Sequence, residues 1–321
     1  MNFIQQGYKG NKEWYWYALT LIVVVVFWQI LGVIPLIAVA FSKTANSSEF
    51  MEAAKSNFVE LGIDSNFYLF LLLFTLIMGL VGLLIGIQFI HARLVKTVVT
   101  SRKSIDWSRV IYAFSVWFGI SVLFLVIGSF LGNEDLVWNF KPLPFTILVL
   151  VSFLFIPLQT SFEELLFRGY LMQGLGVLAK NRWFPLLVTS TVFGLLHGAN
   201  PEVAKLGYGI MVFYIGTGLL YGITTLMDEG TEIALGLHAA NNIVAAIFVT
   251  TDWTVFQTDA LYLDTSEPTL GWDTYIPVFI VYPLLLLIFS KKYGWSNWKD
   301  KLFGTIEEPV YTPEEDYKVL P

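Results

Sequence analysis

The chain has 321 residues, of which 56% are hydrophobic and 14% charged, whereas soluble domains carry roughly a quarter charged residues. The net charge of −6 comes without a basic cluster suited to a phosphate backbone, so we expect no nucleic-acid partner. The chain contains no cysteine, which excludes disulfides, thiolate metal sites and a cysteine nucleophile.

Eight apolar stretches account for the mean hydropathy of +0.66. They predict an all-α fold, a polytopic membrane helix bundle of about eight transmembrane helices, because a helix needs about 20 residues to cross the hydrocarbon core. In chain order the stretches are residues 15–41, 68–90, 110–131, 143–158, 183–196, 206–227, 233–249 and 275–289. The first is far longer than the roughly 7–15 apolar residues of a signal peptide, so we interpret it as a span.

The spans suggest four parts in the chain. Residues 1–142 hold three N-terminal spans, and residues 143–250 form a helical core that contains most of the ionisable residues within apolar stretches. An extracytoplasmic loop and the last span follow at 251–304. The tail at 305–321 is acidic and contains prolines, so we expect it to be disordered.

Lysine and arginine concentrate in loops on the cytoplasmic side of a membrane. In an eight-span arrangement this side receives the basic loop at 91–109, the turn at 180–182 and the segment at 291–301. By contrast, residues 250–274 contain five acidic residues and no lysine or arginine. We therefore predict a multi-pass protein with both termini in the cytoplasm, and we take a bacterial plasma membrane as its location.

The fourth apolar stretch runs directly into Glu163, Glu164 and Arg168. Ionisable side chains at membrane depth cost about 2.5–3.5 kcal/mol each, so they require an explanation. Glu164 and Arg168 are four residues apart and would share a helix face as an ion pair. Glu163 is rotated by about 100° from Glu164 and could face a cavity as a general base. A helix with charges that extend to the membrane surface would account equally well for this stretch alone.

Two histidine motifs occur in later apolar stretches. Phe193 and His197 end the fifth stretch, and His238 and Asn242 lie four residues apart on one face of the seventh. Taken singly, each is explained as well by hydrogen bonds between packed helices. Helix geometry links two of the motifs. Glu163 and His197 would each lie about 20–27 Å from the turn that joins their helices, so they could face each other.

The third histidine of the chain, His91, ends the second apolar stretch beside Arg93. We interpret it as an interfacial residue at the cytoplasmic edge of the membrane.

The three motifs together resemble those of a known family. Glu-Glu-x-x-x-Arg at 163–168, Phe-x-x-x-His at 193–197 and His-x-x-x-Asn at 238–242 are similar, in residues and order, to those of the CPBP intramembrane proteases. That family includes the CAAX prenyl endopeptidases and the Abi-type bacteriocin-immunity proteins. The resemblance covers about residues 143–249 and implies a helical core around a cavity open to the cytoplasm.

The resemblance also implies roles for individual residues. Glu163 and His197 would activate a water molecule, and His238 and Asn242 would stabilise the oxyanion. The residues implied to support them are Glu164, Arg168 and Phe193. The expected reaction is hydrolysis of a peptide bond in a membrane-associated protein or peptide, and nothing in the sequence indicates that this substrate is prenylated.

Other mechanisms and functions remain open from the sequence. A divalent metal such as zinc could be held by Glu163, His197 and His238, with water as the fourth ligand. A non-catalytic membrane regulator or scaffold, similar to a bacteriocin-immunity protein, could use the same polar core to join its helices. A transporter is less favoured, because the sequence shows no internal repeat and no pair of broken helices.

Overall fold

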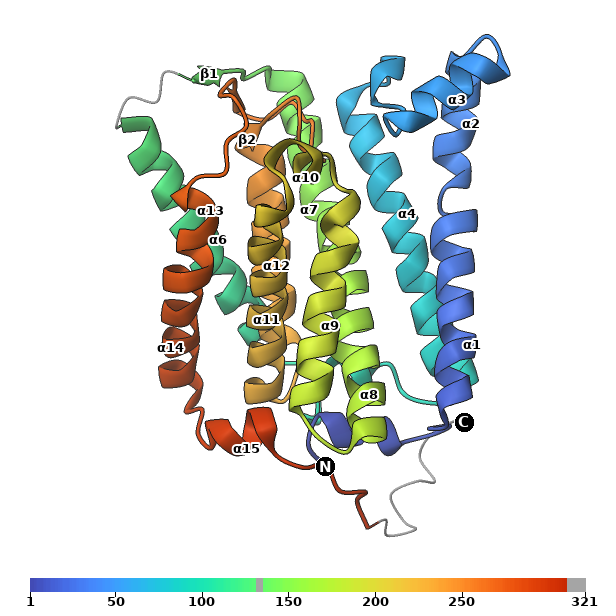
Figure 1. Cartoon of the computed structure of the whole chain (residues 1–321), viewed down its shortest axis with the longest axis vertical. Helices are drawn as coiled ribbons and strands as arrows, with labels where there is room; N and C mark the ends of the chain where they lie inside the picture. The colour runs from blue at the N-terminus through green and yellow to red at the C-terminus, as the bar shows by residue number, and fades with distance from the viewer. Residues whose placement is uncertain (131–134, 311–321) are drawn as a thin grey trace.

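The computed structural model describes residues 1–130 and 135–310. Within these ranges the chain is a bundle of helices with one small sheet, which confirms the predicted membrane helix bundle (Figure 1). Two of its apolar helices, Trp183–Ala199 and Glu232–Ile247, are short and occupy the positions of the predicted fifth and seventh spans. Six described helices are long and apolar enough to cross a membrane: Trp14–Lys43, Ser65–Ile90, Trp107–Gly128, Pro142–Ala179, Tyr208–Asp228 and Thr274–Tyr293.

The N-terminal part of the chain forms the first three of these long helices. In chain order its elements are α1 (Trp14–Val25), α2 (Ile34–Lys43), α3 (Ser47–Lys55), α4 (Ser65–Ile85), α5 (Lys96–Val99) and α6 (Trp107–Phe130). π-helical turns at Val26–Leu31 and Gly86–Ile90 continue α1 and α4. The start of α4 is set by Asp64, whose carboxylate accepts a hydrogen bond from the backbone N–H of Phe67 at 3.0 Å.

The C-terminal part contains the predicted core. Its helices are α7 (Pro142–Glu164), α8 (Met172–Ala179), α9 (Trp183–Leu196), α10 (Pro201–Leu206), α11 (Met211–Asp228), α12 (Glu232–Ile247), α13 (Trp272–Ile276), α14 (Tyr282–Tyr293) and α15 (Trp298–Phe303). A π-helical segment, Leu165–Leu171, joins α7 to α8. The helix of the fourth span therefore continues well past its apolar stretch and carries the charged motif inside the bundle.

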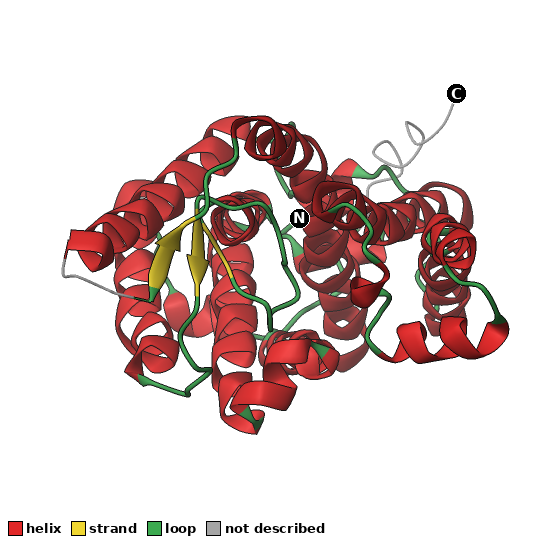
Figure 2. Cartoon of the chain, turned by 90° about the horizontal axis from the view of Figure 1, so that it is seen from above, coloured by secondary structure: helices red, strands yellow, loops and turns green. Residues whose placement is uncertain are grey.

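A small three-stranded sheet lies over one side of the end of the bundle opposite the chain termini, as the end-on view in Figure 2 shows. The central strand β3 (Tyr262–Asp264) pairs antiparallel with β1 (Leu136–Trp138) and parallel with β2 (Val249–Thr250). The sheet thus joins the acidic loop that follows α12 to the segment that precedes α7.

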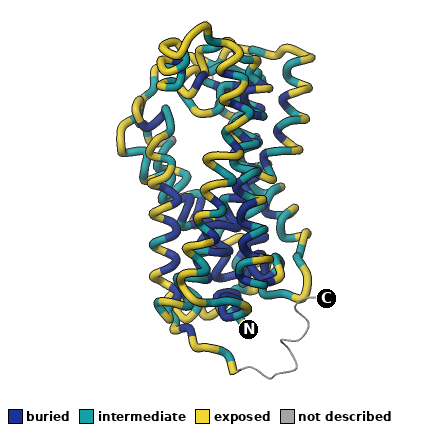
Figure 3. Tube along the Cα trace, turned by 90° about the vertical axis from the view of Figure 1, so that its right-hand side faces the viewer, coloured by how far each residue is buried: buried dark blue, intermediate teal, exposed yellow. Residues whose placement is uncertain are grey.

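Packing differs between the inside and the outside of the bundle. Buried residues are concentrated in the half nearer the termini (Figure 3). There α9 and α11 approach so closely that a Cβ atom on Gly218 would lie 2.7 Å from the carbonyl oxygen of Ser190. Small residues allow such close contact between membrane helices. On the outside, Ile22, Phe124 and Leu154 are more than half exposed, as expected for side chains that face lipid.

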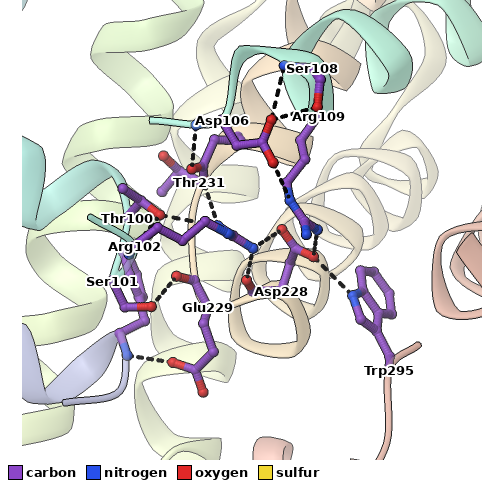
Figure 4. Close-up of polar contacts among 12 residues, drawn as sticks. Thr100, Ser101, Arg102, Asp106, Ser108, Arg109, Asp228, Glu229, Thr231 and Trp295 are labelled. Carbon is purple, nitrogen blue, oxygen red and sulfur yellow. Dashed lines mark hydrogen bonds and ion pairs between the residues drawn. The ribbon is translucent and has the colours of Figure 1, made fainter. Parts of the chain in front are cut away.

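A cluster of ion pairs ties the basic loop to the start of α12 (Figure 4). Arg102 lies 2.7 Å from Asp228 and 3.1 Å from Glu232, the first residue of α12. Arg109 also pairs with Asp228, and the indole N–H of Trp295 donates to the same carboxylate at 3.0 Å. Glu232 is fully buried. Its contact with Arg102 therefore fixes the start of the helix that carries His238 and Asn242.

The start of the predicted disordered tail, 305–321, is ordered. Thr305 forms a backbone bridge with Asn181, and the side chain of Ile306 is 2% exposed. The reason is that this short segment completes the packing beneath α8 and α9. Residues 311–321 lie outside the described residues, so disorder there stays a prediction, as does the division of the chain into four parts.

The interpretation of His91 as an interfacial residue is wrong, because its side chain is fully buried. Its Nδ1 lies 2.5 Å from the carbonyl oxygen of Asn11, and its Nε2 lies 2.6 Å from the hydroxyl of Tyr170. The carbonyl can only accept, so Nδ1 donates and Nε2 accepts from the tyrosine. The N-terminal segment thus folds over the end of the second span and excludes the ring from solvent.

We expect folding stability to depend on the neutral form of His91. Burial lowers the pKa of His91 to about 4, and repulsion from Arg93 acts in the same direction, against a hydrogen bond to Asn11. The unfolded chain therefore binds a proton near pH 6.5 that the folded protein does not bind until about pH 4. The stabilisation is present above pH 6.5 and is lost as the pH falls toward 4. Melting curves in detergent should show a smaller decrease between pH 7.5 and 5 for His91→Gln than for wild type, and equal decreases would contradict the prediction.

Candidate active site

The charged motif lies where α7 changes into its π-helical continuation. Pro157 precedes this change, and its carbonyl oxygen accepts a hydrogen bond from the hydroxyl of Ser161 at 2.6 Å. A π-helical turn holds more residues than an α-helical turn and occurs frequently at functional sites. Here it begins at Leu165, directly after Glu163 and Glu164.

Glu164 and Arg168 form the predicted ion pair. Their side chains are fully buried, with 3.1 Å between Oε1 of Glu164 and Nη1 of Arg168. The guanidinium also donates to the carbonyl oxygen of Gly218 at 3.2 Å and lies 4.1 Å from the ring centre of Phe193. Phe193 is therefore a direct support for the cation, and Tyr221 covers it from a second side at 5.3 Å.

His238 lies between the two carboxylates. Its Nδ1 is 2.7 Å from Oε1 of Glu164, and its Nε2 is 3.3 Å from Oε2 of Glu163. The ring stacks on Tyr221 with 5.1 Å between centres. Glu164 is thus held on two sides, whereas the side chain of Glu163 remains 17% exposed and lines a cavity.

His197 and Asn242 are held by neighbours on their own helices or beside them. Nδ1 of His197 lies 2.8 Å from the carbonyl oxygen of Phe193, so Nδ1 donates and Nε2 carries the lone pair when the ring is neutral. The side-chain amide of Asn242 donates to Oε1 of Gln159 at 3.2 Å. Its oxygen accepts from the amide of Asn241 at 3.1 Å.

One cavity of about 700 Å³ joins the three motifs. Glu163, His197, His238 and Asn242 all line it, and so does Phe193. Glu164 and Arg168 lie behind its wall, fully buried. The structure therefore separates the seven predicted residues into a group that faces the cavity and a buried pair that supports it.

Several cavity residues were not identified from the sequence. Gln159 lies four residues before Glu163, so the spacing on one helix face could have indicated it. Tyr214 and Tyr221 are seven apart on α11, which is two helical turns, and they stack on His197 and His238, respectively. No sequence signal indicated the remaining polar residues of the lining, which are Asn57, Thr75, Asn200, Glu202, Thr217, Asn241, Thr251 and Thr254.

A catalytic zinc ion binds three protein ligands, and the sequence predicted Glu163, His197 and His238 for this role. Both nitrogens of His238 face carboxylates, and Nδ1 of His197 faces a backbone carbonyl. In the part of the chain that the structure describes, no three histidine, aspartate or glutamate side chains converge as a metal site would require. The side chains as placed do not fit the ion, so no chemical step is assigned to a metal.

These features define a polytopic membrane protein with a carboxylate–histidine cavity inside its helices. Residues 142–244 match the family model described as type II CAAX prenyl endopeptidase Rce1-like. The match includes all three motifs and confirms the resemblance to the CPBP proteases for this segment.

The chain is also similar to a bacterial protein over most of its length. The uncharacterized protein YyaK of Bacillus subtilis (strain 168) is 27% identical over 299 residues, which cover 91% of this chain and 97% of that protein. No solved structure matches the chain. The similarity to YyaK therefore extends to the N-terminal helices, beyond the segment that the family model matches.

Proposed function

We propose that this protein is an intramembrane endopeptidase that hydrolyses a peptide bond of a membrane-associated protein or peptide. One observation carries the proposal: Glu163, His197, His238 and Asn242, which come from three separate motifs, line the same cavity in a largely apolar bundle. A match to a protease family over these motifs supports it. We also propose that both termini lie in the cytoplasm and that the membrane is a bacterial plasma membrane.

Glu163 is the general base in this mechanism, because, of the two carboxylates in the charged motif, it is the one that lines the cavity. It takes a proton from a water molecule as the oxygen of that water attacks the carbonyl carbon of the substrate. His238, which the resemblance implies as an oxyanion donor, instead positions Glu163 through its Nε2 and is itself held by Glu164, because each of its ring nitrogens faces a carboxylate.

His197 and Asn242 act on the other atoms of the reaction. Nδ1 of His197 is bonded to the backbone carbonyl of Phe193, whereas Nε2 is not part of that bond. Nε2 can therefore orient the water or, once protonated, give its proton to the leaving amine. Asn242 has two N–H donors, and only one is needed for Gln159. The second can donate to the developing oxyanion, and loss of one such donor typically reduces the rate about 10²–10³-fold.

Two alternatives make different predictions. In the zinc mechanism, Glu163, His197 and His238 would move together around an ion, and a chelator would abolish activity that added zinc restores. A non-catalytic regulator would instead keep the polar core to join its helices. It would tolerate loss of the base at Glu163 while the fold is preserved.

The test is a comparison of the N- and C-termini of membrane proteins in cells that carry wild type or Glu163→Gln at equal expression. We expect new termini with wild type only, because the amide cannot accept the proton of the water. Glu60→Gln, at an exposed position outside the cavity, is the matched control and should behave as wild type. Identical termini in all strains, with a cellular phenotype that survives in Glu163→Gln, would support the regulator.

A further inference from the structure

The catalytic cavity extends toward the end of the bundle that carries the sheet. Beyond the site residues, its lining includes Asn57 after α3, Asn200 and Glu202 at the start of α10, and Thr251 and Thr254 after β2. All three elements lie at the end opposite the chain termini in Figure 1. The lining thus leads from the site to this end.

The opposite end of the cavity is closed. Glu164 and Arg168 lie behind Glu163 without solvent exposure, and Phe193 and Tyr221 are 3% and 2% exposed. Among the described residues that line the cavity, none belongs to the basic loop, to the turn at 180–182 or to the segment after α14. Access from the basic end would require these packed side chains to separate.

Charge identifies the side of the membrane at each end. The closed end carries the basic residues of the N-terminal segment, of the loop at 91–109 and of the segment at 291–301. The open end carries residues 250–274, with five acidic residues and no lysine or arginine. Because basic loops remain in the cytoplasm, the open end is extracytoplasmic.

A hydrogen-bonded group holds the segments around the opening together. The carboxylate of Glu202, whose side chain is buried, accepts from the hydroxyl of Tyr214 at 2.6 Å and from the amide of Asn200 at 3.1 Å. It also accepts from the backbone N–H of Val255 at 3.2 Å. Tyr214 in turn stacks on His197 with 4.6 Å between ring centres. The opening is therefore built by α10, α11 and the loop after β2, and it is connected directly to a site residue.

We infer that the cavity admits its substrate from the extracytoplasmic side, and the inference rests on the proposed protease function. The substrate class is an extended polypeptide segment at the outer surface of the membrane. The threonine and asparagine side chains of the opening can hydrogen-bond to a peptide backbone, and Trp28, Leu72 and Leu76 offer an apolar wall along one side. This direction differs from the cytoplasmic opening that the family resemblance implies.

Accessibility of single cysteines tests the direction without any need for catalysis. Since the chain has no cysteine, each variant contains one thiol. A membrane-impermeant maleimide applied to intact cells should label Thr254→Cys in the cavity lining and Glu60→Cys on the same end. It should label Lys103→Cys in the basic loop only after the cells are permeabilised. The reverse pattern would overturn the inference, and so would an unlabelled Thr254→Cys beside a labelled Glu60→Cys.

The position of the new termini separates this inference from the proposed function. We expect cuts on the extracytoplasmic side of the spans of substrate proteins. Cuts on the cytoplasmic side would overturn the direction of entry but support proteolysis. Absence of cuts would overturn proteolysis, whereas the labelling pattern would still decide where the cavity opens.

Discussion

Replacement of Arg168 by methionine is expected to lower the free energy of unfolding by about 3–5 kcal/mol, because a buried charge loses its partner. The carboxylate of Glu164 would remain fully buried without the guanidinium at 3.1 Å. The variant would also lose the hydrogen bond to the carbonyl of Gly218 and the contact with the ring of Phe193. Denaturation of the purified protein in mixed micelles measures the change.

A double variant separates loss of the charge balance from loss of packing. Glu164→Gln combined with Arg168→Met removes both charges, so it should be more stable than Arg168→Met alone. Lys299→Met, at an exposed position on α15, is the matched control and should change the free energy of unfolding by no more than about 0.5 kcal/mol. If the single and double variants were equally unstable, the ion pair would not be the source of the effect.

The sequence predicted those parts of the site that depend on spacing within one helix. The four-residue separation of Glu164 and Arg168 placed them on a common face, and the structure has their ion pair. The same rule separated Glu163 from its neighbour and so identified the carboxylate that lines the cavity. These predictions succeed because helix geometry alone determines which side chains share a face.

Contacts between helices were beyond such reasoning. The position of His238 between Glu163 and Glu164 depends on how α12 packs on α7. The spacing of residues along one helix does not predict such packing between helices. His91 was placed wrongly because its burial comes from the N-terminal segment, about 80 residues earlier in the chain. Glu202 was missed for a similar reason, since its partner Val255 belongs to a loop that folds back over the cavity.

Replacement of Glu163 by glutamine is expected to reduce kcat/KM about 10²–10⁴-fold, the usual contribution of a general base. The loss should appear in kcat, because glutamine keeps the size of the side chain and its place in the cavity wall. The measurement uses purified protein in lipid nanodiscs with a peptide that spans a cleavage site found by the comparison of termini. Unfolding should resemble wild type, since the side chain of Glu163 is partly exposed and the oxygen of glutamine can still accept a hydrogen bond from Nε2 of His238.

The neighbouring variant Glu164→Gln should give the opposite balance of effects. Its carboxylate is fully buried between Arg168 and His238, so the substitution leaves a buried cation short of a partner and should lower stability more than Glu163→Gln does. If Glu163→Gln kept its turnover and a folded Glu164→Gln lost it completely, Glu164 would be the general base and Glu163 the supporting residue. Such an exchange would require His238 and Arg168 to move away and open a path to Glu164, because the present packing gives water access to Glu163 alone of the two carboxylates.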